Sequence, residues 1–253
     1  MKYSLIVLMA FIMFSCNNKP KIELLSAEEI ISKSIEVSGS EKFENSIVRF
    51  DFREMEYIIH RNRGHYHYER RFNDDLTEIH DVLSNDGFER TREGVLKINV
   101  ADSMKTKYSS SINSVQYFAS LPYGLNAKAV KKALLGEEQI KDRTYYKIKV
   151  TFKEEGGGED FEDVFVYWVD KKSFKVDYLA YSYNEDDGKG MRFREAYNER
   201  YVNGLRFVDY NNYKTEDTST KLVDLGKAFE NNQLKLLSKI ELKNIAVELI
   251  NYL

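Results

Sequence analysis

The feature that most constrains the fold is a series of short segments in which apolar and polar residues alternate, separated by turn residues. A period of two places every second side chain on one face of a sheet, so these segments predict half-buried strands. In the first half of the chain, strands are expected over residues 47–59, 65–72, 79–83 and from Phe88 onwards. In the second half, they are expected over residues 145–152, 164–169, 174–183, 191–202 and 205–213.

The turns between these segments indicate antiparallel hairpins. Residues 61–64, 73–75 and 85–87 carry the Gly, Asn and Asp that tight turns favour. Asn203 and Gly204 form the strongest hairpin signal in the chain, because both residue types tolerate the positive φ that such turns require. The 18 Tyr and 15 Phe also favour a strand-rich fold, since aromatic side chains suit a pleated surface.

Two segments have helical rather than alternating patterns. Ser26 followed by Glu29 is a capping box, and the apolar spacing after it predicts a helix over residues 27–38, ended by Gly39. Residues 100–120 carry apolar side chains at helical spacing and end before Pro122, so a second helix is expected there.

Weaker patterns complete the assignment. A short helix is expected over residues 127–135, closed by Gly136, and another over residues 219–231. Residues 236–247 alternate again and predict one closing strand.

This order of elements predicts an α+β fold. Meandering strands beside helices that are distant in sequence favour a large curved antiparallel sheet of about ten strands, wrapped around or covered by a few helices. No internal repeat and no Pro-, Gly- or Ser-rich linker interrupts the chain after residue 25, so residues 26–253 are expected to form a single domain.

The N-terminus has the pattern of an exported lipoprotein. Lys2 precedes an apolar run over residues 5–14, which is too short for a membrane span but fits a signal-peptide core. Ser15 and Cys16 follow it and resemble a bacterial lipobox, and Cys16 is the only cysteine in the chain. We therefore expect a signal peptide over residues 1–15, lipid attachment at Cys16 and a tether over residues 16–25. An uncleaved anchor with an incidental cysteine is the alternative.

The mature sequence resembles a family of Bacteroidota lipoproteins of unknown function. The resemblance covers most of the mature chain and lies in residues 163–168, 177–183, 191–195, 204–210 and 234–245. These families look like the lipoprotein-carrier half-barrel of LolA and LolB, in which the hollow of an unclosed antiparallel sheet receives acyl chains. The resemblance implies a half-barrel, and it assigns no functional residue. The basic tether, which lacks the acidic run of some surface-exposed lipoproteins in this group, implies an outer-membrane location that faces the periplasm.

Histidines and acidic loops are the candidates for metal binding. His65 and His67 share a strand face, with His60 across the turn and His80 nearby in sequence, but a metal site needs three or four converging ligands. The acidic residues 154–163 and 184–188 lack the regular spacing of a calcium loop. A solvent-facing hairpin and solvated loops are the simpler interpretations, and no metal or cofactor is expected.

Several arginines lie within the expected strands. Arginines two residues apart, such as Arg192 and Arg194, share a sheet face and could bind a lipid headgroup or another anion. They could equally pair with Glu69, Glu195 and Glu199 across strands. The other members of this set are Arg49, Arg53, Arg70, Arg200 and Arg206.

Three functions remain compatible with the sequence. The first is a non-enzymatic, membrane-tethered protein that binds a hydrophobic or amphiphilic ligand in the hollow of the sheet. The second is a structural or interaction lipoprotein with a filled core. The third is a hydrolase with dispersed carboxylates, although no HExxH, GxSxG, P-loop or CxxC motif is present. The formal net charge of −3 gives no reason to expect nucleic-acid binding. Whether the hollow is open or filled decides between the first two.

Overall fold

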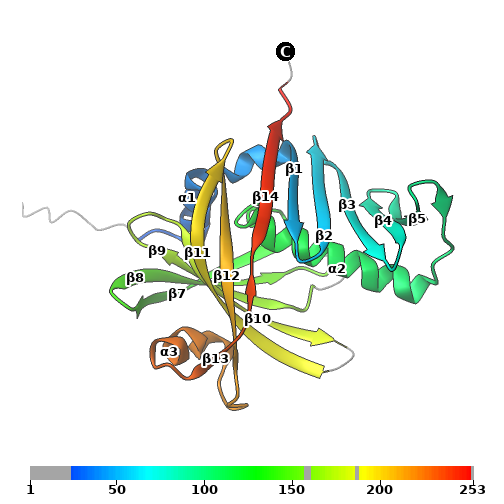
Figure 1. Ribbon diagram of the computed structural model, residues 1–253. Coiled ribbons are helices and arrows are strands. Elements are labelled where there is room, and N and C mark those ends of the chain that lie inside the picture. Colours follow the sequence, from blue (N-terminus) through cyan, green and yellow to red (C-terminus); the bar gives the residue numbers. More distant parts are fainter. Residues whose placement is uncertain (1–23, 157–160, 186–187, 252–253) are drawn as a thin grey trace, which may run out of the picture.

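The computed structural model describes residues 24–156, 161–185 and 188–251, and this part of the chain forms two antiparallel seven-stranded sheets (Figure 1). In the first sheet the spatial order is β14-β1-β2-β3-β4-β5-β6. Its strands are β1 (Asn45–Phe52), β2 (Met55–Asn62), β3 (His65–Asp74), β4 (Thr77–Ser84), β5 (Gly87–Arg92), β6 (Leu96–Lys97) and β14 (Leu242–Leu249).

The second sheet has the order β13-β12-β11-β10-β9-β8-β7. Its strands are β7 (Val130–Ile140), β8 (Arg143–Phe152), β9 (Val164–Asp170), β10 (Val176–Glu185), β11 (Gly188–Val202), β12 (Leu205–Thr215) and β13 (Leu234–Ile240). The helices are α1 (Ala27–Val37), α2 (Asp102–Ser120) and α3 (Leu225–Glu230), with 3-10 turns η1 (Ser40–Glu44) and η2 (Leu222–Asp224). The expected α+β class, with a curved antiparallel sheet and a few helices, is confirmed.

At its C-terminal end the chain passes directly from the second sheet into the first, because only Glu241 separates β13 from β14. Asp209 of β12 holds this junction: its carboxylate accepts hydrogen bonds from the Leu242 amide at 3.0 Å and from Arg200 at 2.9 Å. The single closing strand expected over residues 236–247 is therefore two strands, one in each sheet. The alternation alone could not show this break, since it continues on both sides of Glu241.

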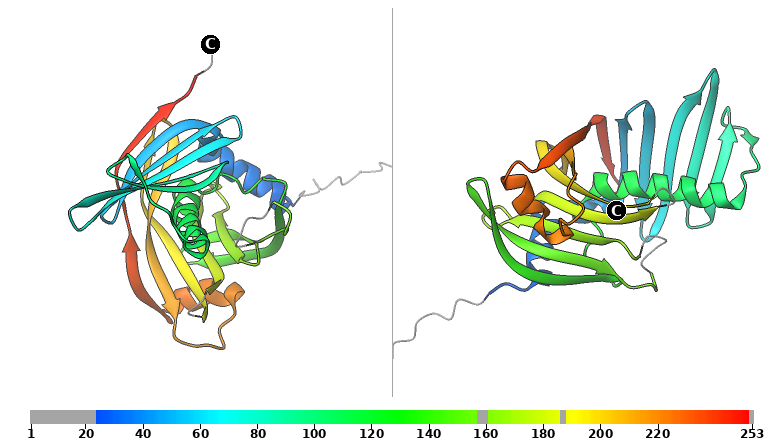
Figure 2. Two further views of the ribbon diagram at one scale, coloured as in Figure 1. Left: turned by 90° about the vertical axis from the view of Figure 1, so that its right-hand side faces the viewer. Right: turned by 90° about the horizontal axis from the view of Figure 1, so that it is seen from below.

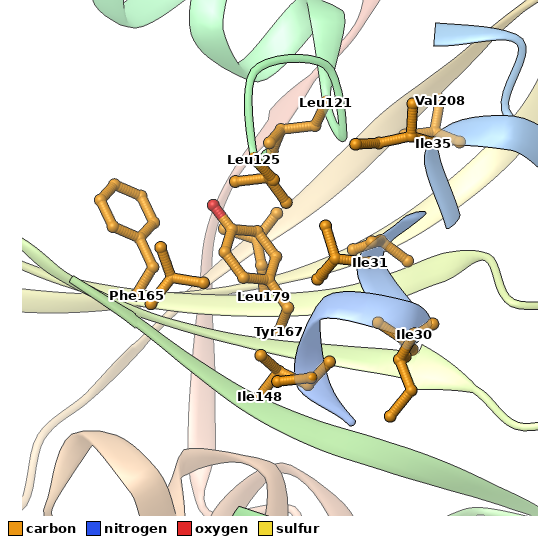
Figure 3. Packing of buried hydrophobic residues seen from close by; sticks show 14 of the residues in the cluster. Ile30, Ile31, Ile35, Leu121, Leu125, Ile148, Phe165, Tyr167, Leu179 and Val208 are labelled. Carbon is orange, nitrogen blue, oxygen red and sulfur yellow. The ribbon is translucent and has the colours of Figure 1, made fainter. Parts of the chain in front are cut away.

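Helix α1 begins at the expected capping box. The Glu29 amide donates to the Ser26 hydroxyl at 3.2 Å, and the Ser26 amide donates to the Glu29 carboxylate at 2.7 Å. The buried face of the helix packs on the second sheet (Figure 3), and the packing residues are Ile30, Ile31, Ile35, Ile148, Tyr167 and Leu179.

Three details of the expected secondary structure are wrong. Residues 47–59 form a hairpin, β1 and β2, that turns at Arg53 with a φ of 56°. No helix forms over residues 127–135: residues 127–129 lie in a turn, and residues 130–135 belong to strand β7, which pairs with β8. A register shift between Leu134 and Gly136 interrupts the period of two and gives this strand a spacing like that of a helix. The helix expected over residues 219–231 is shorter and comprises η2 and α3.

Helices α1 and α2 lie on one side of the two sheets, which we call the concave side, and α3 covers the opposite face of the second sheet (Figure 2). Helix α2 lies between the sheets, where Ile112 and Ala119 pack with Val48 and Phe50 of β1 and Phe207 of β12. The hollow of the curved sheets is therefore largely filled by helices and side chains. In the part of the chain that the structure describes, no helix is long and apolar enough to span a bilayer.

Candidate ligand cavity under helix α2

A cavity of about 280 Å³ remains on the concave side, where α2 crosses the meeting point of the two sheets. Its apolar wall comes from both sheets and from α2 and consists of Phe52, Met55, Val115, Phe118, Ala119, Val208, Ile240 and Leu242. Its polar wall consists of Arg53, Tyr57, Arg70, Ser111, Ser114, Arg194, Tyr210, Asn212 and Ser238. Ser111 and Ser114 are exposed on α2, so the cavity opens to solvent along this helix.

Strand register explains how the second sheet brings polar groups to the cavity. Arg194 of β11 pairs with Asn212 of β12, and Asn212 pairs in turn with Ser238 of β13. Side chains of directly paired residues lie on the same face, so these three form one row that faces α2. The Asn212 amide donates to the Ser238 hydroxyl at 3.2 Å, and this bond ties the row together.

On the first sheet, the two arginines in the corresponding row share one acid. Asp81 is completely buried and accepts from Arg70 at 2.6 and 3.0 Å and from Arg90 at 2.6 and 2.9 Å. Arg70 also donates to the Ser111 hydroxyl of α2 at 3.0 Å. The Arg90 guanidinium lies 3.8 Å from the centre of the Tyr108 ring, and its hydrogen bonds to Asp81 raise its pKa. These contacts fix α2 over the first sheet.

Arg194 has no such partner. Only 7% of its surface is exposed, and within the described ranges its side chain makes one hydrogen bond, from Nη2 to the Tyr181 hydroxyl at 2.9 Å. Its guanidinium stacks 3.6 Å from the centre of the Phe118 ring, and no ion pair with it forms among the described residues. Burial lowers the pKa of the Arg194 guanidinium, since a desolvated cation is costly. Arg194 Nε and Asn212 Oδ1 are buried without a hydrogen-bond partner in the described structure.

Among the described residues, the cavity wall therefore carries positive side chains and no negative ones. Of the described residues that line it, three are arginines and none is an aspartate or glutamate. Arg53 lies at the exposed β1–β2 turn, whereas Arg70 and Arg194 are buried. Such a wall suits an apolar ligand that carries a negative group.

A second cavity of about 360 Å³ lies beside the β7–β8 turn, and most of its charged groups form ion pairs with one another. Arg206 pairs with Glu199 and Asp177, Lys175 pairs with Glu199 at 2.7 Å, and Arg143 pairs with Asp177 at 3.0 Å. Burial raises the pKa of Asp177 despite these cations. We regard this network as structural.

Comparison with known proteins places the chain in a family. The model of a family of unknown function, DUF6503, matches residues 2–242. The chain belongs to the DUF6503 family. No curated protein matches the sequence significantly.

Comparison of the DUF6503 protein with solved structures gives matches at very low sequence identity. A DUF1329 family protein from Desulfovibrio piger superposes with a TM-score of 0.50 and 10% identity, over 88% of this chain and 93% of the other. A LolA superfamily protein from Nitrosomonas europaea gives a TM-score of 0.45 and 11% identity, over 91% and 96% of the chains. The lipoprotein LppX of Mycobacterium tuberculosis gives 0.27 and 10%, over 66% and 92%. Only the first of these likenesses reaches the level of a shared fold.

The histidines singled out in the sequence lie on the face of the first sheet away from α2, and two of them, His67 and His80, contact Glu69. His60 pairs with His67 across β2 and β3, and Glu69 lies 2.9 Å from His80 and 3.4 Å from His67. Arg71 also forms an ion pair with Glu69, at 2.6 Å, so one oxygen of this carboxylate already has a cationic partner. Within the described ranges, no group of three or more His, Cys, Asp or Glu side chains could hold a metal ion.

The other candidates from the sequence are the acidic loops, Cys16 and the strand arginines, and the structure describes only some of them. Residues 157–160 and 186–187 of the acidic loops, and Cys16 with the rest of residues 1–23, lie outside the described residues. Arg192 and Arg194 share a face, as expected from their spacing. Arg70, Arg200 and Arg206 pair with carboxylates, Arg49 and Arg53 are exposed, and Arg194 alone of this set is buried without an acid.

Sequence reasoning missed Asn212 and most of the other residues that line the cavity of the DUF6503 protein, and it missed Asp81, which binds Arg70 beside the cavity. Asp81 occupies an inward-facing position between Ile79 and Leu83, and a charge at such a position in an alternating strand is the available signal. Asn212 gives no comparable signal, because its neighbours in sequence are also polar.

Proposed function

We propose that this DUF6503 protein is a lipid-anchored, non-enzymatic protein of the cell envelope that binds an amphiphilic ligand in the cavity under α2. The observation that supports this function best is the cavity itself, with an apolar wall and buried arginines. Apolar groups that enter it leave water, which contributes about 25 cal/mol per Å². The resemblance of the sequence to lipoprotein carriers is consistent with such a ligand.

The size of the cavity limits what it can hold. Ligand sites usually measure about 300–1,000 Å³, so 280 Å³ accommodates a single chain or part of one rather than a whole diacyl lipid. The rest of the ligand would leave through the opening beside Ser111 and Ser114.

Blocking this opening tests the proposed function. Full-length protein purified from its native membrane would be analysed by native mass spectrometry, together with the variants Ser114→Trp and Asn113→Trp. Ser114 lines the cavity, whereas its neighbour Asn113 is exposed and does not. We expect one bound amphiphile in the wild type and in Asn113→Trp, and at least about a tenfold lower occupancy in Ser114→Trp. Absence of a ligand from all three, or equal occupancy in all three, would contradict the proposal.

The proposed anchor is Cys16, and the proposed location is the outer membrane, facing the periplasm. Each buried methylene of an acyl chain contributes about 0.8 kcal/mol, so two or three chains would hold the protein durably. Cys16→Ser should move the protein to the soluble fraction of a cell lysate. Continued membrane association of this variant would rule out the lipid anchor.

A role in protein interaction is the second candidate, because apolar side chains are exposed at the far end of the first sheet. Leu76 is 100% exposed, Val95 80% and Leu96 62%, and all three lie away from the cavity. A photo-crosslinker placed at Leu76 in the cell would test this role. A single crosslinked partner, lost when Val95 and Leu96 are changed to serine, would support it.

A further inference from the structure

We infer that the ligand of the cavity is a single-chain anion whose carboxylate or phosphate is bound by Arg194. This inference rests on the proposed function and adds the chemical class of the ligand and the residue that selects it.

The Arg194 side chain is buried without an acidic partner among the described residues. A buried guanidinium without an acid is unusual, because charged groups that leave water are normally paired. Arg194 uses one of its five N–H donors on the Tyr181 hydroxyl, and the buried Nε has no partner among the described residues. The side chain therefore has donors to spare on the wall of a cavity.

Aromatic rings hold the Arg194 guanidinium in position. The Phe118 ring lies 3.6 Å and the Tyr181 ring 5.1 Å from the guanidinium carbon, and ring faces attract a cation without neutralising its charge. Phe118 belongs to α2 and lines the same cavity. The aromatic contacts keep Arg194 in place while its charge remains uncompensated.

The described residues around the cavity carry an excess of positive charge. Asp81 is shared between Arg70 and Arg90, so this buried group of three carries a net positive charge in addition to that of Arg194. None of the described residues that line the cavity is acidic. A carboxylate or phosphate would complete the balance, since the guanidinium binds both through paired hydrogen bonds.

Competition between matched ligands tests the inference. Full-length protein in a neutral detergent would be incubated with equimolar hexadecanoate and hexadecanol at pH 8, and the bound species counted by native mass spectrometry. The variants are Arg194→Met, which removes the charge but keeps an unbranched side chain, Arg194→Lys, which keeps the charge, and Arg192→Met as control. Arg192 shares the strand face with Arg194 but does not line the cavity.

We expect the wild type and Arg192→Met to prefer hexadecanoate about tenfold or more, as for a hydrogen bond to a charged group. Arg194→Met should lose this preference while it still binds hexadecanol, and Arg194→Lys should retain part of it. Hexadecyl phosphate, tested alongside, separates a carboxylate from a phosphate as the preferred anion, and a preference for either supports the inference.

Equal binding of hexadecanol and hexadecanoate by the wild type would overturn the anionic class but leave the proposed function standing. Failure of all three probes to bind would overturn both. An unchanged preference in Arg194→Met would remove Arg194 from the recognition of the anion.

Discussion

At the residue scale, arginines on the strands of one protein have different physical roles that depend on register and depth. Arg70 and Arg90 converge on Asp81, Arg206 pairs with Glu199 and Asp177, and Arg194 faces a cavity without an acid. The spacing of Arg192 and Arg194 predicts a common face. Which arginine is left unpaired depends on strands distant in sequence, and no local pattern encodes this.

The Arg70–Asp81–Arg90 group should be important for stability. Asp81→Asn keeps the size of the side chain but leaves two largely buried cations without their acid, and this should reduce the free energy of unfolding by about 3–5 kcal/mol. Urea denaturation followed by circular dichroism measures the change. The control is Glu89→Gln, which breaks an exposed ion pair with Lys97 and should cost less than about 0.5 kcal/mol. Equal effects of the two variants would refute the structural role of Asp81.

Asp170 should give part of the stability a pH dependence. Burial raises the pKa of Asp170, but hydrogen bonds from the Ser173 amide and hydroxyl and from the Lys172 amide outweigh it, so the pKa lies below its ordinary value. A lowered pKa in the folded state stabilises the protein above the unfolded pKa of about 3.9, and this contribution is lost as the pH falls through the folded value. Asp170→Asn mimics the protonated form, so its stability deficit should be present at pH 7 and shrink below about pH 4. Urea midpoints over this range measure the deficit, and a constant difference would disprove the assignment.

At the element scale, the sequence predicts most strands and both long helices, because their periodicity is local. It fails where the backbone departs from regular pairing. The bulge at Gly136 gives β7 a helical spacing, and Arg53 turns the chain at a position that is not occupied by glycine, asparagine or aspartate. The break at Glu241 is set by Arg200 of β11 and Asp209 of β12.

The turn after α1 should depend on a close approach that only glycine permits. Gly39 has a φ of 62°, and a Cβ placed there would lie 1.9 Å from the Gly204 carbonyl oxygen in the β11–β12 turn. Gly39→Ala should therefore cost the backbone strain of roughly 1–2 kcal/mol plus roughly 1–3 kcal/mol for displacing that turn. Gly94→Ala is the control, since Gly94 has a similar φ of 68° with open space around it. If thermal unfolding showed the same loss for both variants, α1 would not depend on this contact.

At the scale of the whole molecule, the structure answers the question that the sequence left open about the hollow. Two curved sheets joined at Glu241 surround α2, whose side chains and those of α1 fill most of the space and leave a cavity of about 280 Å³ between the sheets and α2. The lining residues come from segments as distant as Phe52 and Leu242. The sequence predicts the aromatic strands and the helix, but it could not separate a cavity from a core, because both are lined by the same residue types.

The most direct test of the central claim is to map where an amphiphile binds. Full-length protein would be labelled with hexadecanoate that carries a photoreactive diazirine on its chain, and the modified peptides identified by mass spectrometry. We predict labelling on α2 around Val115 and Phe118 and on β12 and β13 around Tyr210 and Ile240. Labelling confined to the exposed end of the first sheet around Leu76 and Val95, with none under α2, would contradict the account.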